Sequence, residues 1–288
     1  MKEATPALAA TVVVIREGKT DIEFFMVQRH SRSGFMAGAH VFPGGKLEDS
    51  DRDWARTLPQ VEQNRAAALL DHRLSPVAAA AFALAAIRET AEECGILLAH
   101  DTSAQAASPE IAQQVFQALQ REAALADELQ RFGLQPSLEA LAPFAWWLTP
   151  SAEPRRFDTR FFLARVPANQ QAKADMRETV AGDWFSPQGA LDAYEKGEIN
   201  LAPPTLATIE DLRSCSRFTD AAQVPLRPIE CICPKRIQDA DSLVLALPGD
   251  PLHDEAKRVQ RSTRTRIIRN ADGRFQSLSY DGAGTSGK

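Results

Sequence analysis

Residues 88–96 read Arg-Glu-Thr-Ala-Glu-Glu-Cys-Gly-Ile and place three carboxylates at positions i, i+3 and i+4. Residues three and four apart share one face of a helix, so Glu89, Glu92 and Glu93 are expected to lie together. Three neighbouring carboxylates repel one another unless a positive group lies between them. Because hard oxygen ligands suit Mg²⁺ or Mn²⁺, this turn predicts a metal site completed by water and phosphate oxygens.

A solvated charged face is the alternative explanation for a Glu-rich turn. The preceding residues, 78–84, are almost entirely apolar, so the helix is expected to be buried over much of its length. Ser75 and Pro76 form an N-cap followed by proline at the first helical position, and Gly95 is a left-handed stop. We therefore expect one helix from Pro76 to Cys94 with a functional acidic end.

A second segment, residues 42–51, reads Phe-Pro-Gly-Gly-Lys-Leu-Glu-Asp-Ser-Asp. Gly44 and Gly45 permit a sharp turn and bring backbone amides close to a ligand, which makes both candidate substrate-binding residues. Together, the two segments resemble the signature box of the Nudix hydrolases. That pattern is a glycine, five residues, an acid, seven residues, and then Arg-Glu-aliphatic-x-Glu-Glu-x-Gly-aliphatic.

Three departures from the family pattern are visible. Gly45 matches the leading glycine and Asp51 stands where the family usually has glutamate, while Thr90 replaces an aliphatic residue. In addition, 36 residues, 52–87, separate the two halves where the pattern has seven. This arrangement is similar to the acyl-CoA diphosphatase branch, which carries a long insertion inside the box.

The resemblance implies an α+β Nudix fold, an α/β/α sandwich around a mixed β-sheet, with a helical insertion in the box on the substrate side. We expect the Nudix domain to span residues 1–224, with the split box at 44–51 and 88–96. A β-rich C-terminal extension, 225–288, is expected to follow, with a disordered tail at 282–288.

The resemblance also implies the chemistry. Glu89, Glu92 and Glu93 would hold Mg²⁺ or Mn²⁺ against a diphosphate, and a water acidified by the metal would attack phosphorus. Glu89, Glu92 or Glu178 would take the proton, and the residues alone do not choose among them. Glu178 is a candidate because it lies six residues before Trp184, a spacing found in several Nudix enzymes.

Arg88 is expected to act on its neighbours rather than on the substrate. Its guanidinium can clamp carboxylates such as Glu92 or Asp51 in a fixed geometry. The alternative for Arg88 is a surface ion pair, which contributes little to stability. We therefore count Arg88 among the catalytic candidates as an orienting residue.

The segment 28–38 resembles the coenzyme A recognition segment that precedes the box in CoA-cleaving Nudix enzymes. Gly38 falls in register, Gly34 replaces the family's internal arginine, and Arg29 and Arg32 are candidates for binding the extra phosphate of CoA. We expect hydrolysis of CoA or an acyl-CoA to 3′,5′-ADP and (acyl-)phosphopantetheine. The alternatives are ADP-ribose or NADH as substrate, or a Nudix module that senses a nucleotide without cleaving it.

Periodicity and turn residues predict further elements. A hairpin of strands 9–15 and 23–29 is expected first. The helix 108–132 could form a lid, provide the contact of a homodimer, or pack on the edge of the sheet. The other expected elements are the strands 143–148, 157–166, 229–233, 242–247, 265–269 and 274–280 and the helices 61–72 and 187–197.

Composition limits the classes of partner. The net charge of −5 argues against nucleic acid or an anionic membrane as the main partner, because such binding uses clustered basic charge. The four cysteines have no spacing typical of a disulfide framework or zinc site. No secretory leader, membrane-length apolar run or C-terminal Ser-Lys-Leu is present, so a cytoplasmic location is expected.

Overall fold

The computed structural model describes residues 4–30, 38–177, 179–238, 242–259 and 263–279. The strands of its central sheet are β1 Ala7–Glu17, β2 Ile22–Arg29, β3 His40–Val41, β4 Gly44–Lys46, β7 Leu141–Leu148, β8 Phe157–Arg165, β9 Thr179–Phe185 and β10 Cys231–Ile232. Their order is β10-β7-β8-β1-β2-β3, with β4 paired to β1 and β9 paired to β2. β1 runs parallel to β8 and antiparallel to β2, so the sheet is mixed.

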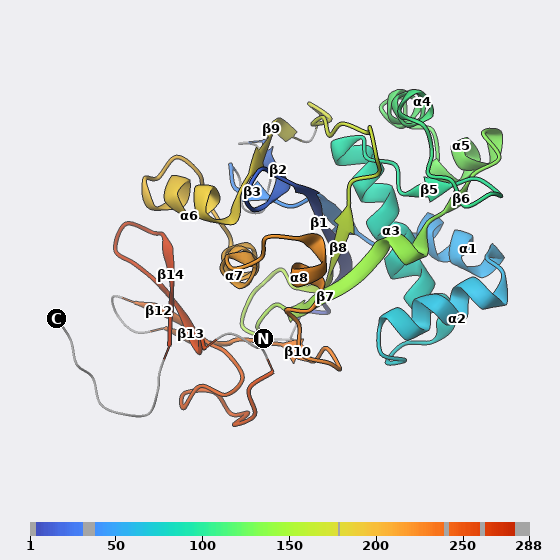
Figure 1. The fold of residues 1–288 in the computed structure, drawn as a ribbon. Helices are drawn as coiled ribbons and strands as arrows, with labels where there is room; N and C mark the ends of the chain where they lie inside the picture. The colour runs from blue at the N-terminus through green and yellow to red at the C-terminus, as the bar shows by residue number, and fades with distance from the viewer. Residues whose placement is uncertain (1–3, 31–37, 178, 239–241, 260–262, 280–288) are drawn as a thin grey trace.

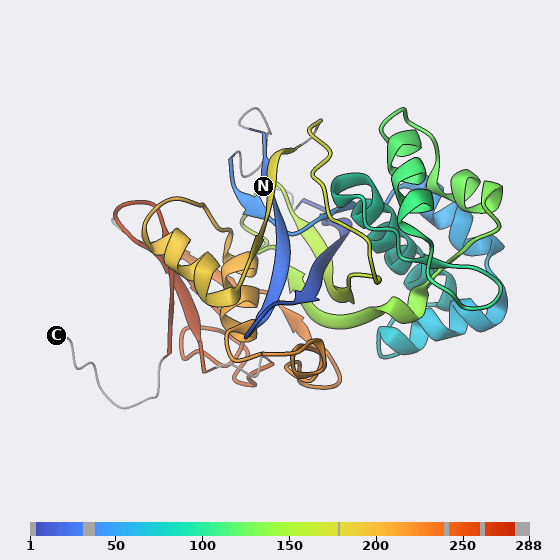
Figure 2. The same ribbon diagram turned by 45° about the horizontal axis from the view of Figure 1, so that its top comes forward.

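Helices cover both faces of this sheet, which confirms the predicted α+β sandwich. Figures 1 and 2 show α1 to α5 on one side and α6 to α8 on the other. The helices are α1 Asp49–Thr57, α2 Gln60–Leu69, α3 Pro76–Cys94, α4 Pro109–Leu119, α5 Leu125–Arg131, α6 Pro187–Glu195, α7 Pro203–Leu212 and α8 Phe218–Ala222. The short pair β5 Ala99–His100 and β6 Gln135–Pro136 and a 3₁₀ turn, Leu138–Ala140, lie between α3 and β7 in sequence.

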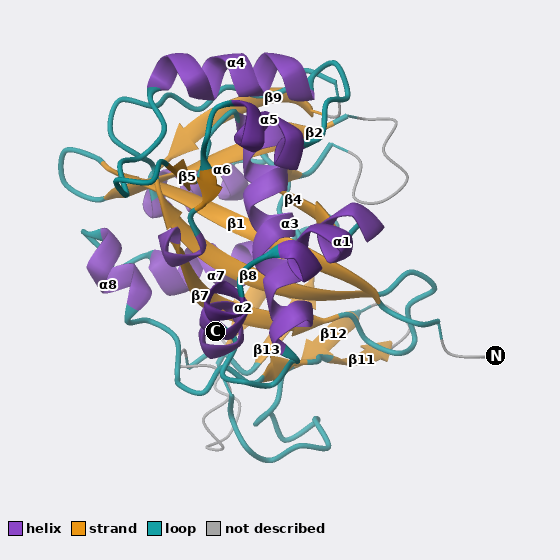
Figure 3. Ribbon diagram, turned by 90° about the vertical axis from the view of Figure 1, so that its right-hand side faces the viewer, coloured by secondary structure: helices purple, strands orange, loops and turns teal. Residues whose placement is uncertain are grey.

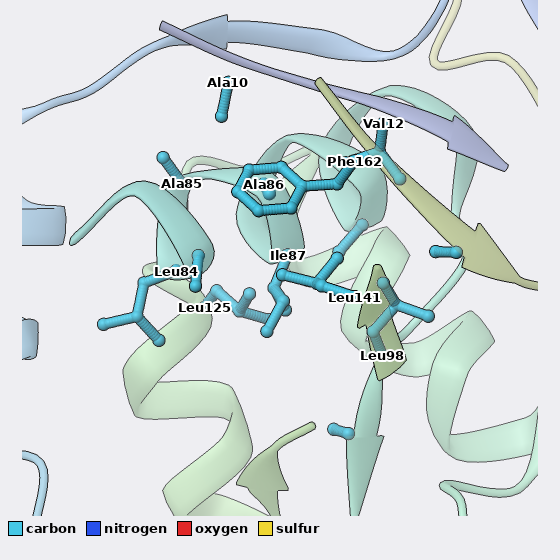
Figure 4. Packing of buried hydrophobic residues seen from close by; sticks show 14 of the residues in the cluster. Ala10, Val12, Leu84, Ala85, Ala86, Ile87, Leu98, Leu125, Leu141 and Phe162 are labelled. Carbon is cyan, nitrogen blue, oxygen red and sulfur yellow. The ribbon is translucent and has the colours of Figure 1, made fainter. Parts of the chain in front are cut away.

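Helix α3 is the centre of the first helical layer. It has the predicted bounds, with the Ser75 hydroxyl accepting the Ala78 amide and Gly95 at φ 68°. Residues 79–87 are at most 2% exposed, because α3 packs between the sheet and the other helices. Figure 4 shows Phe162 and Val12 of the sheet facing Ala86 and neighbouring residues of α3. Alanines let the surrounding elements approach the helix closely, and a helix that is apolar all round must be buried.

The two faces of the sheet belong to two separate cores. On β1, Ala10, Val12 and Val14 pack with α3, whereas Val13 and Ile15 pack with α6 and α7. Alternation along a strand produces this division, because successive side chains point to opposite faces. The face to which a side chain belongs can therefore be read from its position on its strand.

Several sequence predictions are confirmed and one is wrong. The first hairpin and the strands at 143–148 and 157–166 appear within a residue or two of their expected bounds, as does the helix from Pro187. The single helix expected over 108–132 is instead two helices, α4 and α5. The chain breaks at residues 120–124, where Glu122 takes a left-handed φ of 67°. The sequence does not indicate this break, because the residues around it are strong helix formers. Tertiary packing of the two short helices overrides that propensity.

The insertion within the box is helical, as predicted, but its helices differ in detail. The expected helix 61–72 is α2, Gln60–Leu69, and the sequence prediction missed α1 before it. The four cysteines are free, and Cys94 is fully buried. No helix in the described ranges is both long and apolar enough to cross a membrane.

The C-terminal segment forms a second sheet and also extends the first. Strands β11 Lys235–Gln238, β12 Leu243–Ala246, β13 Arg266–Arg269 and β14 Phe275–Leu278 are antiparallel neighbours, and β11 was not predicted. β10 pairs in parallel with β7, so the expected strand 229–233 is shorter and completes the central sheet. The proposed boundary at residue 225 therefore separates segments that share one sheet. The expected tail at 282–288 lies outside the described residues.

Two arginines form ion pairs that stabilise this second sheet, and the pairs of Arg264 attach it to α7. Arg264 donates to the carboxylates of Glu210 and Asp211 on α7. Arg266 donates two hydrogen bonds to Asp250, of 2.8 and 2.9 Å, and the Leu252 amide donates a third. Burial alone would raise the pKa of Asp250, but these hydrogen bonds outweigh burial and hold it below its ordinary value.

The substitution Asp250→Asn should therefore destabilise the fold. Removing one partner of a buried ion pair costs about 3 kcal/mol, here by leaving Arg266 without its carboxylate. Because the folded-state pKa is lowered, this stabilisation is complete above the unfolded value of about 3.9 and is lost as pH falls through the folded-state pKa. Denaturant unfolding of both proteins from pH 7 down to pH 3 measures the difference, which should shrink at the acid end.

Asp254→Asn is the matched control for this experiment. Asp254 pairs with Lys235 on the same sheet, but its side chain is 82% exposed. An exposed pair contributes little, so this variant should unfold like the wild type. Equal destabilisation by the two substitutions would contradict the role assigned to Asp250.

Candidate active site

The guanidinium of Arg88 organises the acidic end of α3. Its Nε and Nη2 donate to the two carboxylate oxygens of Asp51, at 2.9 and 2.8 Å. Its Nη1 donates to Glu89 and Glu92, both at 2.9 Å, and Nη2 also donates to the Lys46 carbonyl at 3.0 Å. An arginine has five N–H donors, and all five are used here. The clamp that the sequence predicted for Arg88 is thus present in the structure.

Asp51 connects this arginine to the first helix of the insertion. It is 1% exposed and occupies the N3 position of α1, where one carboxylate oxygen also accepts the Glu48 amide at 2.9 Å. The same side chain therefore caps α1 and binds Arg88. Figure 3 shows α1 and β4 beside α3. The two halves of the box, separated by 36 residues, meet through this one carboxylate.

The glycines of β4 allow the sheet to approach α3. The Gly44 amide donates to Oε2 of Glu93 at 2.9 Å. A Cβ atom on Gly45 would lie 2.3 Å from Oε1 of Glu89, and one on Gly44 would lie 2.4 Å from the Ala10 carbonyl oxygen. Both distances are too short for any side chain. Glycine is therefore required at both positions by close packing against the carboxylates and against β1.

Burial and charge shift the acid–base properties of the cluster. Burial would lower the pKa of Arg88, but hydrogen bonding to Asp51 and the charges of Glu89 and Glu92 raise it, so this arginine stays protonated. Burial raises the pKa of Glu92, and the charge of Arg88 opposes that rise. Glu92 therefore takes up a proton more readily than an exposed glutamate does.

A cavity of about 1190 Å³ lies over the cluster. Ligand sites commonly measure about 300 to 1000 Å³, so this space suits a large small-molecule ligand. The acidic cluster, the end of α4 with the 120–126 segment, the arm at 147–159, and the C-terminal sheet all contribute to its walls. Representative lining residues are Gly44, Gly45, Lys46, Glu89, Glu92, Glu93, Trp54, Gln120, Leu125, Trp147, Phe161, Leu243, Leu245 and Phe275.

The cavity includes some of the substrate-binding residues expected from the sequence and omits others. Gly44, Gly45 and Arg29 line it, whereas Gly38, at φ 73° in a turn, is not among the lining residues. Arg32 and Glu178 lie outside the described residues. Their roles stay predictions.

The structure also adds lining residues that the sequence did not suggest. Lys46, next to Gly45, is a lining residue, and the break at 120–124 brings Gln120 and Glu122 to the cavity wall. From the insertion 52–87, Trp54 is the one described lining residue, because α2 packs against α3 instead. Neither a lysine after two glycines nor a break between two helices has a specific sequence pattern. The sequence therefore did not predict these lining residues.

Oxygen ligands for a divalent cation are present, but they do not by themselves form a complete coordination site. The positive group that the sequence required between Glu89 and Glu92 is the guanidinium of Arg88. In the described part of the chain, no three His, Cys, Asp or Glu side chains are grouped closely enough to hold a metal ion. Mg²⁺ is usually bound by one or two carboxylates together with waters and substrate phosphates. This donor set fits a cation that is completed by its substrate.

Comparison with known proteins gives a consistent family. A family model described as the NUDT19 Nudix domain matches residues 1–212. The chain is 34% identical over 284 residues to the acyl-coenzyme A diphosphatase NUDT19 of Gallus gallus, with 83% of this chain and 74% of that protein covered. The protein of the same name from Homo sapiens is 29% identical over 276 residues, with 80% and 72% covered. A solved Nudix hydrolase from Alicyclobacillus acidocaldarius is 28% identical, with a TM-score of 0.59, and the match covers 76% of this chain and 96% of that one.

The substitution Asp51→Asn tests whether Arg88 depends on this carboxylate. It should lower the free energy of unfolding by about 3 kcal/mol, because a buried arginine loses its bidentate charged partner. Asp53→Asn, on the same helix, is the control, since Asp53 is 74% exposed in a surface pair with Arg56. Urea denaturation measures both variants, and an Asp51→Asn protein as stable as the control would refute the assignment.

Proposed function

We propose that this chain, which belongs to the NUDT19 Nudix domain family of Nudix hydrolases, cleaves the diphosphate of CoA or an acyl-CoA. The products are 3′,5′-ADP and phosphopantetheine or its acylated form. Relatives that carry the name acyl-coenzyme A diphosphatase support this substrate, because they match over more than two thirds of their own length. The chain is a hydrolase of phosphoanhydrides within this family.

The observation that carries the proposal is the acidic cluster around Arg88 at the wall of a large cavity. Arg88 orients Glu89 and Glu92, and the Gly44 amide orients Glu93. A module that only senses nucleotides has no need for this fully bonded arrangement of carboxylates. The cluster therefore favours an enzyme over a sensor.

A divalent cation is the cofactor expected for the family, and we propose Mg²⁺ or Mn²⁺. Glu89, Glu92 and Glu93 would hold it, with oxygen donors of the kind that these ions prefer. When bound, such an ion neutralises charge on the phosphate oxygens and makes a nearby water more acidic. Diphosphates resist hydrolysis because a nucleophile meets a shell of negative oxygens. Neutralising charge on these oxygens lowers the barrier to attack.

The protein's own groups position and deprotonate the reacting water. The water oxygen forms a bond to one phosphorus, the bridging P–O bond breaks, and the leaving phosphate keeps the bond electrons. Glu89, Glu92 or Glu178 accepts the water proton. Arg88 and Asp51 fix the carboxylates without contacting substrate, since every Arg88 donor is already used within the protein.

Substrate recognition is proposed for groups along the rest of the cavity. Arg29 and Arg32 would meet the extra phosphate of CoA, and Lys46 would contact the diphosphate beside the glycines of β4. Residues 1–224 would carry the reaction, with the 225–288 segment as an extension. The homodimer and the cytoplasmic location inferred from the sequence stay predictions.

Incubation of the purified protein with Mg²⁺ or Mn²⁺ and candidate substrates tests the reaction. We expect cleavage of CoA and octanoyl-CoA, read as 3′,5′-ADP by chromatography, and loss of all cleavage after chelation of the metal. Faster cleavage of ADP-ribose or NADH would assign the alternative substrates. Tight binding of one compound without cleavage of any would refute the hydrolase and favour the sensing module.

The substitution Glu92→Gln tests the acidic cluster directly. We expect kcat to fall about 10²- to 10⁴-fold, because the amide neither accepts a proton nor binds the cation as a carboxylate does. Glu17→Gln is the matched control, since Glu17 pairs with Arg165 at the surface and is not among the cavity-lining residues. Full activity in the Glu92→Gln protein, or an equal loss in the control, would contradict the assignment.

A further inference from the structure

The C-terminal sheet β11–β14 has no part in the cleavage step, yet it reaches the catalytic cavity. Leu243 and Leu245 of β12 and Phe275 of β14 line that cavity, as does Pro234 just before β11. Figure 1 shows this sheet on the side of α6 and α7, across the central sheet from α4 and α5. The cavity thus extends from the acidic end of α3 to an element that the reaction does not require.

Other residues of the cavity lining are also apolar. Phe161 of β8 and Trp147 of β7 belong to the core on the α7 side of the central sheet and line the cavity there. Pro203 and Pro204, at the start of α7, complete this region. We call these eight residues the apolar wall: Trp147, Phe161, Pro203, Pro204, Pro234, Leu243, Leu245 and Phe275.

Groups suited to a phosphate lie on the opposite face of the sheet. Arg29 follows Phe25 and Val27 at two-residue spacing on β2, and those residues pack on the α3 side. Its Nε atom is buried and has no hydrogen-bond partner in the described structure. Arg177 lies on the same side, where it donates to the Gln120 carbonyl at the end of α4. Arg29 and Arg177 thus bring cationic groups to the cavity lining, beside the acidic Glu122 and Asp175, and the apolar wall forms another part of that lining.

We propose that the apolar wall binds the acyl-pantetheine arm of a thioester substrate and gives the enzyme its preference for acylated CoA. This inference rests on the proposed function, because the acidic cluster fixes where the diphosphate lies. With the adenosine 3′-phosphate directed to the Arg29 side, the other end of the molecule extends toward Leu243 and Phe275. Burial of the acyl methylenes against apolar side chains then adds affinity with each carbon.

The other possible occupant of the wall is the adenine ring. Trp147 could stack on a base, and Arg155, from the arm between β7 and β8, also lines the cavity. Beside its three aromatic residues, the wall contains two leucines and three prolines, which can pack against a flexible alkyl chain and offer no π-face to a flat heterocycle. The two occupants differ in a measurable way, because adenine is present in CoA and acyl-CoA alike.

The test compares CoA with octanoyl-CoA in the full chain carrying Leu243→Ser. The wild type should prefer octanoyl-CoA, and the variant should lose about tenfold in kcat/KM for octanoyl-CoA with little change for CoA. Val244→Ser is the matched control. Val244 is the next residue of β12, is also half-buried, and is not among the cavity-lining residues. The more conservative Leu243→Ala should show the same selective loss. Thermal unfolding of each variant would reveal whether a substitution disrupts folding instead.

Calorimetric binding without divalent metal separates this inference from the proposed function. The wild type should bind octanoyl-CoA more tightly than CoA, and Leu243→Ser should abolish that gain. If the wild type binds both ligands but cleaves neither, the hydrolase proposal fails. The contribution of the apolar wall to binding affinity is still measured in that case. Equal losses for both ligands, no loss for either, or no acyl preference in the wild type would overturn the inference.

Discussion

The bidentate contact between Arg88 and Asp51 is the interaction on which the rest of the site depends. Asp51 caps the first helix of the insertion, and Arg88 binds two carboxylates of the last turn of α3 and the Lys46 carbonyl of β4. One buried ion pair therefore joins helix α1, helix α3 and strand β4. The carboxylates have a fixed geometry because each N–H of the guanidinium has a partner within the protein.

The mixed sheet gives the cavity two chemically different sides. Alternation on β1, β2 and β8 assigns successive side chains to two cores, one under α3 and one under α6 and α7. The glycines of β4 lie at the border of the two, where the absence of side chains lets the sheet approach the acidic cluster. Cationic side chains such as Arg29 and apolar residues of the C-terminal sheet both line the cavity. This combination suits the proposed substrate, which has a phosphate-rich end and an aliphatic end.

The additions to the minimal fold contribute unequally to this site. The insertion within the box mostly stabilises α3, with α2 packed against it and only Trp54, among its described residues, at the cavity wall. The C-terminal segment, in contrast, contributes several side chains to the cavity wall. It completes the central sheet through β10, anchors itself to α7 through Arg264, and supplies side chains to the cavity. The sequence placed the insertion on the substrate side, and in the structure both the insertion, through Trp54, and the C-terminal sheet line the cavity.

The sequence by itself determined the local features of this protein. Cap residues determined both ends of α3, carboxylate spacing identified its acidic turn, and the chemistry of Arg88 predicted a clamp on carboxylates such as Glu92 or Asp51. These features depend on residues close in sequence or on a repeated family motif. Only the tertiary structure decided that Arg88 binds Asp51, Glu89 and Glu92 at once, where the helix after Ser108 breaks, and which segments line the cavity. Such contacts join residues far apart in the chain, and packing of distant elements, rather than local propensity, determines them.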